Sequence, residues 1–151
     1  MPLPSIAIAA DHAGFEMKQL LVAYLAERSY PLTDFGPPDA SRVDYPDYAA
    51  LVAEAVSQGQ ADLGILVCGT GIGMAIAANK FAGVRAANLL SPEFALLARQ
   101  HNAANVAALS GRFVDAETNL EIVEAFLNAE PLGGRHADRV DKIRALEAGG
   151  D

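Results

Sequence analysis

The sequence predicts an α/β fold: a five-stranded parallel sheet with strand order 2-1-3-4-5, covered by helices on both faces and followed by a C-terminal helix. Short apolar runs alternate with longer helical stretches, the pattern of repeated strand–helix units. The run at residues 63–67 is rich in branched side chains, as expected for a strand buried on both faces. With 151 residues, 52% of them hydrophobic, the chain can build one core, so we expect a single domain over residues 1–151.

The first five segments are predicted from their apolar content and their boundary residues. Residues 5–10 form an apolar strand, and residues 15–27 form a helix with apolar side chains at helical spacing. Residues 31–35 form a shorter strand, expected nearer an edge because it begins with proline, which has no backbone N–H. Residues 36–45 hold two prolines, a glycine and several polar side chains, so a loop is expected. A proline then suits the first turn of the helix at residues 46–56.

The middle of the chain repeats the strand–helix pattern twice. Residues 63–67 form the third strand, which runs into a glycine-rich turn and then a helix over residues 74–81. Residues 84–88 form the fourth strand. The next helix covers residues 92–100, and Ser91 is its expected N-cap because a serine hydroxyl can accept a hydrogen bond from a free amide of the first turn.

The last part of the chain holds one strand and two helices. Residues 106–110 form the fifth strand, and residues 116–128 form the helix after it. Residues 131–134 include a proline and two glycines and interrupt the helical pattern. A final helix is expected over residues 138–148. The sequence contains no internal repeat, low-complexity segment or interdomain linker.

Composition and charge argue against several classes of partner. The net charge of −8 and the lack of a Lys/Arg cluster argue against binding to nucleic acid or to an anionic membrane. No segment approaches the roughly 20 apolar residues of a transmembrane helix, and the N-terminus lacks the basic region of a signal peptide. The single cysteine cannot form an internal disulfide, so we expect the reducing environment of the cytoplasm.

The turn after the third strand is the first candidate site. Cys68 ends the strand, and Gly69, Gly71 and Gly73 follow at alternate positions before a helix. A strand that runs through glycines into a helix can direct several backbone N–H groups at one point, where an anion or a developing oxyanion could bind. The spacing fits neither the dinucleotide fingerprint nor a P-loop. Glycines also serve turns and close packing, and a lone cysteine is commonly a small buried hydrophobe, so both readings stand at this point.

Topology predicts a second set of polar residues beside this turn. In a sheet of order 2-1-3-4-5, ligands bind beyond the carboxyl ends of the strands where the strand order reverses, between the first and third strands. The first strand ends at Asp11 and His12, and the third ends at Cys68, Gly69 and Thr70. We therefore expect these side chains to share one site. An aspartate at a strand end is otherwise commonly a helix N-cap.

Five motifs occur in order along nearly the whole chain. They are DHAGF at residues 11–15, DYPDYA at 44–49, CGTGIG at 68–73 with AANK at 77–80, RQHN at 99–102 with Ala104 and Asn105, and GGRH at 133–136 with Arg139. Together they resemble the ribose-5-phosphate isomerase B family, which also includes the galactose-6-phosphate isomerase subunits. The resemblance implies a three-layer, Rossmann-like α/β/α fold and a metal-free, cofactor-free interconversion of D-ribose 5-phosphate and D-ribulose 5-phosphate.

The resemblance also implies roles in an isomerisation through a cis-enediolate. Cys68 is the expected base at the sugar carbon; one subgroup of the family uses a glutamate in the loop, where this chain has Met74. The amides of the glycine loop would hold the oxyanion, and Thr70 would position Cys68 or pass protons. His101 is the expected acid/base for opening the sugar ring. Without the family resemblance, a histidine at the C-terminal end of a helix is more often a cap or a partner of the helix dipole than a catalyst.

The remaining expected site residues bind substrate. They are Asp11, His12, Tyr45, Gly69, Gly71, Ile72, Gly73, Asn102, Arg112, Arg135 and Arg139. Arg135 and Arg139 are four residues apart, so on one helix face they could grip a phosphate, although such a pair is otherwise a solvated surface. Asn102 could equally be a helix C-cap, and Tyr45 could be a packing residue. His136 is expected to be structural.

In the family the pocket is shared in a homodimer, and the resemblance implies that His101, Asn102 and Arg112 reach in from the partner subunit. The sequence leaves open a dimer or a tetramer, and whether Arg42 reaches the pocket. It also leaves open two other functions. One is isomerisation of another aldose phosphate, such as allose 6-phosphate, galactose 6-phosphate or an erythrulose phosphate. The other is a non-catalytic nucleotide- or anion-binding module.

Overall fold

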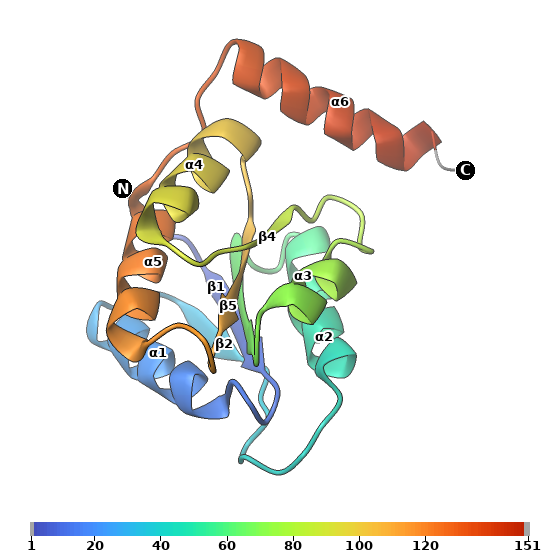
Figure 1. Cartoon of the computed structure of the whole chain (residues 1–151). Coiled ribbons are helices and arrows are strands. Elements are labelled where there is room, and N and C mark those ends of the chain that lie inside the picture. The colour runs from blue at the N-terminus through green and yellow to red at the C-terminus, as the bar shows by residue number, and fades with distance from the viewer. Residues whose placement is uncertain (1, 150–151) are drawn as a thin grey trace.

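The computed structural model describes residues 2–149; Met1, Gly150 and Asp151 lie outside the described residues. Its strands are β1 (Ile6–Ala10), β2 (Leu32–Asp34), β3 (Leu63–Cys68), β4 (Ala86–Asn88) and β5 (Val106–Ser110). Its helices are α1 (Phe15–Glu27), α2 (Tyr45–Ser57), α3 (Ile72–Ala78), α4 (Pro92–Asn102), α5 (Ala116–Asn128) and α6 (Arg135–Gly149). Every expected strand and helix is present, with ends shifted by a turn or less (Figure 1).

The five strands form one parallel sheet in the order β2-β1-β3-β5-β4. The expected α/β class and the pairing of the first and third strands are confirmed, but the expected order 2-1-3-4-5 is wrong for the last two strands. The physical reason lies in their lengths and burial. All five residues of β5 are buried, whereas β4 has three residues that are only partly buried. The longer, wholly buried strand occupies the interior of the sheet, and the short one closes its edge.

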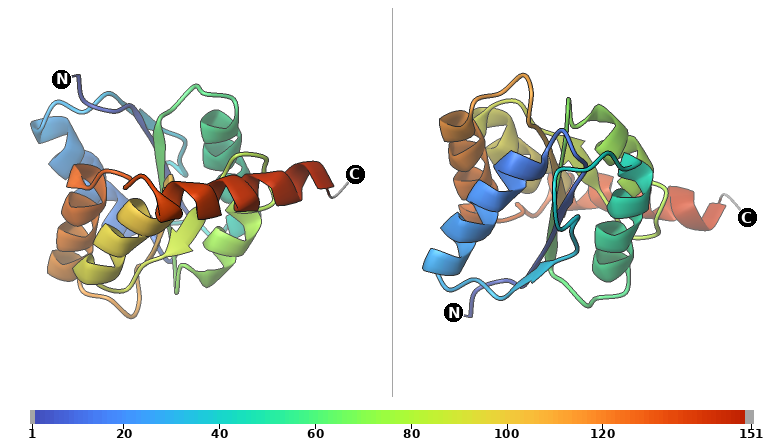
Figure 2. Two further views of the ribbon diagram at one scale, coloured as in Figure 1. Left: turned by 90° about the horizontal axis from the view of Figure 1, so that it is seen from above. Right: turned by 90° about the horizontal axis from the view of Figure 1, so that it is seen from below.

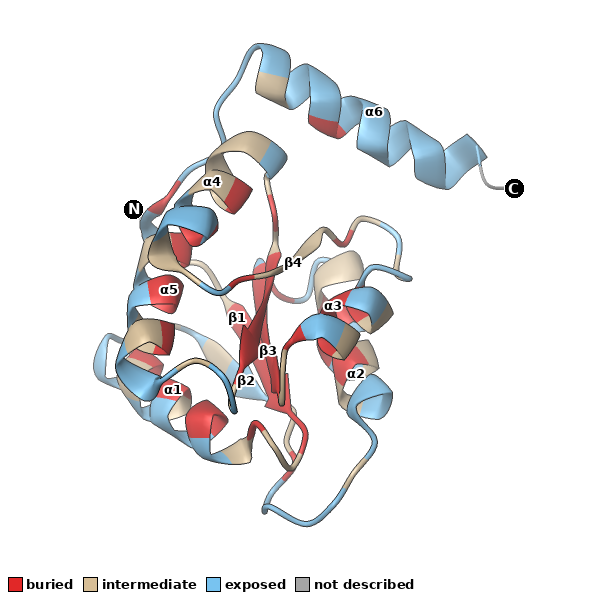
Figure 3. Ribbon diagram, in the orientation of Figure 1, coloured by how far each residue is buried: buried red, intermediate tan, exposed pale blue. Residues whose placement is uncertain are grey.

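Helices cover both faces of the sheet (Figure 3). The core on one face is formed with α1, α4 and α5, and the core on the other with α2 and α3. This division follows from right-handed crossovers, because connections that run in opposite directions along the sheet place their helices on opposite faces. The step from β4 back to β5 therefore puts α4 on the side of α1, which is where it lies.

The arrangement makes the carboxyl end of β3 the natural position for a site. Both neighbours of β3, which are β1 and β5, are followed by helices on the face opposite to α3. The chain thus leaves β3 toward one face and leaves its neighbours toward the other, which opens a crevice where the strands end. The change of face occurs on both sides of β3, between β3 and β1 and between β3 and β5.

The last helix, α6, lies apart from the sandwich across the amino end of the sheet (Figures 1 and 2). It is exposed along almost its whole length, and Val140 is its one buried residue. It begins at Arg135, three residues earlier than expected, so Arg135 and Arg139 both lie on the helix. No helix within residues 2–149 is long and apolar enough to cross a membrane.

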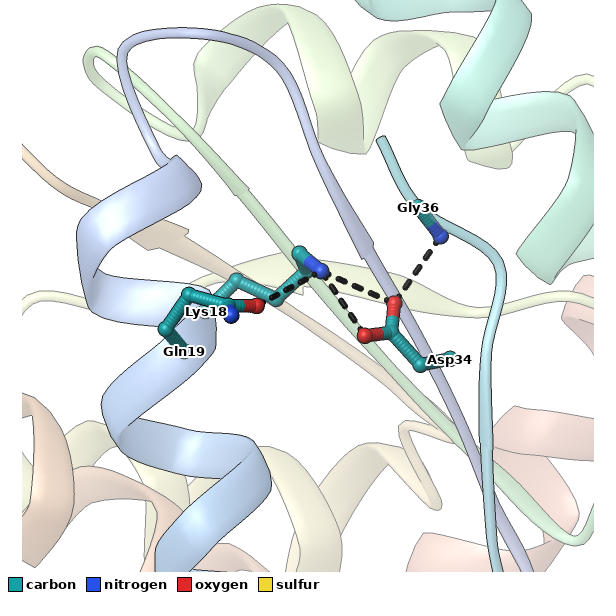
Figure 4. A network of polar contacts seen from close by, with 4 residues as sticks. All are labelled: Lys18, Gln19, Asp34 and Gly36. Carbon is teal, nitrogen blue, oxygen red and sulfur yellow. Dashed lines mark hydrogen bonds and ion pairs between the residues drawn. The ribbon is translucent and has the colours of Figure 1, made fainter. Parts of the chain in front are cut away.

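One buried ion pair joins the first helix to the edge strand (Figure 4). Lys18 of α1 is 1% exposed, and its Nζ donates to both carboxylate oxygens of Asp34, at 2.9 and 2.8 Å. The same carboxylate accepts from the N–H of Gly36 at 2.9 Å, and Lys18 also donates to Gln19 at 3.0 Å. The pair therefore fixes the end of β2 and the start of the loop after it against α1.

Candidate active site

The carboxyl ends of β1, β3 and β5 bring polar residues together at one edge of the sheet. Asp11 and His12 follow β1, Cys68 ends β3, and Arg112 follows β5. Cys68 pairs in register with Ser110, and Ala10 pairs with Val67, so the three strands end at the same level. The expected meeting of the first-strand and third-strand residues is thus what the register produces.

The sulfur of Cys68 faces the glycine loop. Its Sγ accepts a hydrogen bond from the N–H of Gly71 at 3.1 Å, and the residue is 5% exposed. The amide therefore holds the sulfur against the start of α3. Cys68 also belongs to the buried core on the face of α2 and α3, so its catalytic role stays a prediction.

The loop itself is fixed by hydrogen bonds to its carbonyl oxygens. The hydroxyl of Ser110 donates to the carbonyl of Gly69 at 2.7 Å, and the side-chain amide of Asn88 donates to the carbonyl of Thr70 at 3.1 Å. Gly71 has φ +85°, a left-handed conformation that glycine adopts without strain. With its carbonyls held in this way, the loop keeps one conformation beside the sulfur.

Two amides of this loop already have partners. The N–H of Gly71 is taken by the sulfur, and the N–H of Ile72 donates to the hydroxyl of Thr70 at 3.1 Å. Thr70 therefore closes the first turn of α3 with its side chain. Sequence reasoning missed Asn88 and Ser110, because both act on the loop from strands distant in the sequence and carry no motif of their own.

Asp11 and His12 are both oriented by backbone amides. Asp11 is buried, and its Oδ1 accepts from the N–H of Gly14 at 3.0 Å, so it does cap the turn into α1. The Nδ1 of His12 accepts from the N–H of Val43 at 3.3 Å. In the neutral imidazole the proton then resides on Nε2, which makes that nitrogen a donor available to a ligand.

A cavity of about 520 Å³ opens beside these two residues. It is lined by Asp11, His12 and the loop and helix start from Arg42 to Asp47, so Arg42 lies in the same cavity wall as Asp11 and His12. Tyr45, the first residue of α2, closes it toward the glycine loop: a Cβ built on Gly73 would overlap the Tyr45 ring. The aromatic ring therefore lies directly against the loop backbone.

Arg112 belongs to this same-chain cluster. Its N–H donates to the carbonyl of Gly69 at 3.1 Å, and a Cβ built on Gly69 would lie 3.4 Å from its Cδ and 3.5 Å from its Nη1. The expectation that Arg112 reaches into a partner subunit's pocket stays a prediction; within its own chain the guanidinium lies along the glycine loop. The reason is the strand order, which sets the end of β5 immediately beside the end of β3.

The other expected residues lie at the opposite edge of the sheet. His101 and Asn102 occupy the last turn of α4, which leads into the start of β5, and His101 lines a cavity of about 630 Å³ together with Leu63. Leu63 begins β3, the strand that Cys68 ends. Because β5 alone spans about 13 Å, His101 cannot reach Cys68 within one chain. Figure 1 shows α4 and α6 meeting at this far end.

His101 and His136 form a stack at this edge. Their ring centroids are 4.2 Å apart and the planes differ by 3°. Desolvation lowers the pKa of His136, and the charges of His101, Arg135 and Arg139 lower it further. Asn102 is exposed and is not the C-cap, because Ala103 takes the left-handed conformation that ends α4. Within residues 2–149, no group of three or more His, Cys, Asp or Glu side chains could hold a metal ion.

Comparison with known proteins identifies a family for this arrangement. The family model described as Ribose/Galactose Isomerase matches residues 6–143. The ribose-5-phosphate isomerase B of Escherichia coli (strain K12) is 49% identical over 145 residues, which cover 96% of this chain and 97% of the relative.

Solved structures agree with the sequence match. The ribose-5-phosphate isomerase B of Clostridium thermocellum superposes with a TM-score of 0.95 at 45% identity, covering 97% of this chain and 99% of the other. The enzyme of Mycoplasma genitalium, solved with bound ribulose 5-phosphate, gives a TM-score of 0.92 at 46% identity, covering 95% and 96%.

Proposed function

The chain belongs to the ribose/galactose isomerase family, and from that premise we propose that it interconverts D-ribose 5-phosphate and D-ribulose 5-phosphate through a cis-enediolate. The observation that carries the proposal is the contact between the Cys68 sulfur and the N–H of Gly71, at 3.1 Å. It holds the one thiol of the protein against the glycine loop at the end of β3, beside the core on the face of α2 and α3. The relatives named above act on the same pair of sugars or bind one of them.

Cys68 is the base in this proposal. Starting from ribose 5-phosphate, its thiolate removes the C2 proton, and the C2 electrons form the C1=C2 bond of the enediolate while charge develops on O1. The proton on O2 then passes to O1, and the proton held by the thiol returns to C1, which leaves a ketone at C2. Thr70, whose hydroxyl lies in the same turn, carries the proton between the two oxygens. The amides of Gly69 and Gly73 stabilise the oxyanion, since those of Gly71 and Ile72 already donate to the sulfur and to the Thr70 hydroxyl.

A homodimer completes the site. The catalytic sulfur lies at one edge of the sheet, and His101, Asn102, Arg135 and Arg139 lie at the other. We propose that the partner subunit's copies of these four residues face the Cys68 crevice. In that position His101 opens the sugar ring, Asn102 binds hydroxyls, and the two arginines, one turn apart on α6, grip the phosphate.

The residues around Cys68 hold the sugar from within the same chain. The Nε2–H of His12 and the carboxylate of Asp11 bind substrate oxygens, and the Tyr45 ring closes the pocket wall. Arg112 lies along the loop, where its guanidinium adds positive charge. In a chain of net charge −8, this local positive charge is what attracts an anionic sugar.

The proposed reaction needs no metal and no cofactor, so turnover should be unchanged by EDTA. It needs a reduced thiol, which suits the cytoplasm. We further propose that the whole chain works as one domain. Steady-state kinetics with ribose 5-phosphate, allose 6-phosphate and galactose 6-phosphate identify the preferred substrate. We expect ribose 5-phosphate to give the highest kcat/KM.

Replacement of Cys68 tests the chemistry. Cys68→Ala should lower kcat at least about a thousandfold, because Cys68 is the base of the proposed reaction and removal of an essential base costs on this scale. Binding of the sugar phosphate, measured by calorimetry, should stay within about threefold. Arg135→Ala is the matched comparison and should mainly raise KM. Near-normal turnover in Cys68→Ala would remove the sulfur from the mechanism.

A further inference from the structure

His136, which stacks on His101, is the residue of the far edge that the proposed chemistry does not use. One ring comes from the end of α4 and the other from the start of α6, and they lie 4.2 Å apart and parallel within 3°. Elsewhere α6 is almost fully exposed. The two imidazole faces are thus one of the contacts that join α4 to the start of α6.

The geometry constrains His101 more than its own helix does. His101 lies in the last turn of α4, one residue before the helix ends, and two residues before Ala103 with φ +47°. A side chain in a terminal turn is free to change rotamer unless something packs against it. The flat face of His136 restricts the His101 ring to one plane, and leaves its edge, where both nitrogens lie, free for a ligand.

Charge favours the stack at neutral pH. The groups whose charges act on His136 are His101 from α4 and Arg135 and Arg139 from its own helix, and all of them disfavour a proton on it. Desolvation and these charges lower the pKa of His136, which favours its neutral form. A neutral ring can lie face to face with His101 without repelling it, whether or not His101 carries a proton.

We propose that His136 is a positioning residue for ring opening, which sets the plane of the His101 imidazole. The proposal rests on the proposed function. Ring opening takes the proton from the O1 hydroxyl, forms the C1=O1 bond, breaks the bond from C1 to the ring oxygen O4, and places a proton on O4. Both proton transfers occur at the edge of one imidazole, so they depend on the plane in which that ring is held.

An exchange experiment separates ring opening from proton abstraction. Ribulose 5-phosphate is acyclic because its O5 carries the phosphate, so deuterium exchange at its C1 in D2O requires the enediolate but no ring opening. His136→Ala should lower turnover of ribose 5-phosphate about tenfold or more, the usual range for a displaced general acid/base. The C1 exchange rate, followed by NMR, should stay within about twofold of the wild type.

Two further variants keep the test informative. His136→Phe retains a flat ring and should recover most of the turnover that His136→Ala loses. Lys142→Ala, an exposed change on the same helix, should leave both rates unchanged. Equal losses of turnover and exchange in His136→Ala, or no recovery by phenylalanine, would overturn the positioning role. Absence of ribose 5-phosphate turnover in the wild type would instead overturn the proposed function.

Stability provides a readout independent of activity. The fold lowers the pKa of His136, so the unfolded chain takes up a proton there, near its unperturbed pKa of about 6.5, while the folded chain does not. Acid therefore favours unfolding of the wild type. The stability that the neutral His136 contributes is fully present only above the pKa of the unfolded chain, about 6.5. His136→Phe removes this titration, so its stability relative to the wild type should rise from pH 8 to pH 5. A constant difference would contradict the neutral stack.

Discussion

Two glycines of the active-site loop are needed for different physical reasons. Gly71 has φ +85°, and a side chain there would also overlap the amide of Asn88. Gly73 has an ordinary helical backbone, but a Cβ would overlap the ring of Tyr45. The first glycine is required by the backbone, and the second by the aromatic residue that closes the pocket.

Gly73→Ala tests the pocket wall without altering the loop backbone. The added methyl should push the Tyr45 ring outward, a movement that a half-exposed side chain makes at small cost. We expect kcat/KM to fall about tenfold while the free energy of unfolding changes by less than about 1 kcal/mol, since no core contact is lost. Steady-state kinetics and urea unfolding measure the two quantities.

Gly149→Ala is the control, because a Cβ there would meet nothing within 4 Å. It should leave both quantities unchanged. The losses of kcat/KM caused by Gly73→Ala and Tyr45→Ala should not add in the double variant, because both changes disrupt the same pocket wall. Additive losses would mean that Gly73 acts on something other than the Tyr45 ring.

At the residue scale, the sequence predicted the positions of candidate residues that lie directly at the end of a strand. Cys68, Asp11 and His12 stand at strand ends, so alternation and topology placed them together. Asn88 and Ser110 could not be found this way, because their hydrogen bonds reach a loop on a strand far away in sequence. The position of Arg112 along its own glycine loop could not be predicted either, because it depends on which strand lies beside β3.

At the scale of elements, the Lys18–Asp34 pair joins α1 to β2 close to the site. Gly14, which starts α1, accepts from the N–H of Lys18, and Gly36 beyond β2 accepts from the N–H of Ala10. The pair therefore lies between the turn that holds Asp11 and the loop that carries the pocket wall. Its carboxylate is still partly open to water, with 35% of the side chain exposed.

Lys18→Met tests this link because methionine keeps the buried stem and removes the charge. Breaking a buried pair leaves an uncompensated carboxylate and costs about 3–5 kcal/mol when fully buried; the open side of Asp34 should reduce this to about 2 kcal/mol. Urea unfolding gives the value. Arg144→Ala, which removes an exposed pair with Asp141, is the control and should cost less than about 1 kcal/mol. Equal costs would show that the buried pair contributes no more than a surface one.

Element boundaries and strand order were the parts that sequence could not supply. The fourth and fifth strands read as similar apolar runs, and only their packing shows that β5 is buried throughout while β4 lies at the edge. The start of α6 was placed late because the glycines before it suggest a loop, although Arg135 already lies on the helix. Each error concerns contacts between segments rather than the nature of a segment.

At the scale of the whole molecule, the residues of the proposed active site lie at opposite edges of the sheet. Cys68, the glycine loop and Arg112 lie at the carboxyl edge, and His101 lies with the α6 arginines at the amino edge. A rigid sheet separates them, so no rotation of side chains can join them. An active site that needs both halves must be built from two copies of the chain.

Subunit complementation tests this central claim most directly. Cys68→Ala and His101→Ala should each be inactive alone. In a heterodimer, one site receives both defects and the other receives neither. Random mixing of equal amounts should therefore restore about a quarter of wild-type turnover, because half of the dimers are mixed and each has one intact site. If Cys68 and His101 worked within a single chain, every site would carry a defect, and mixed samples would show no more turnover than the two variants measured separately.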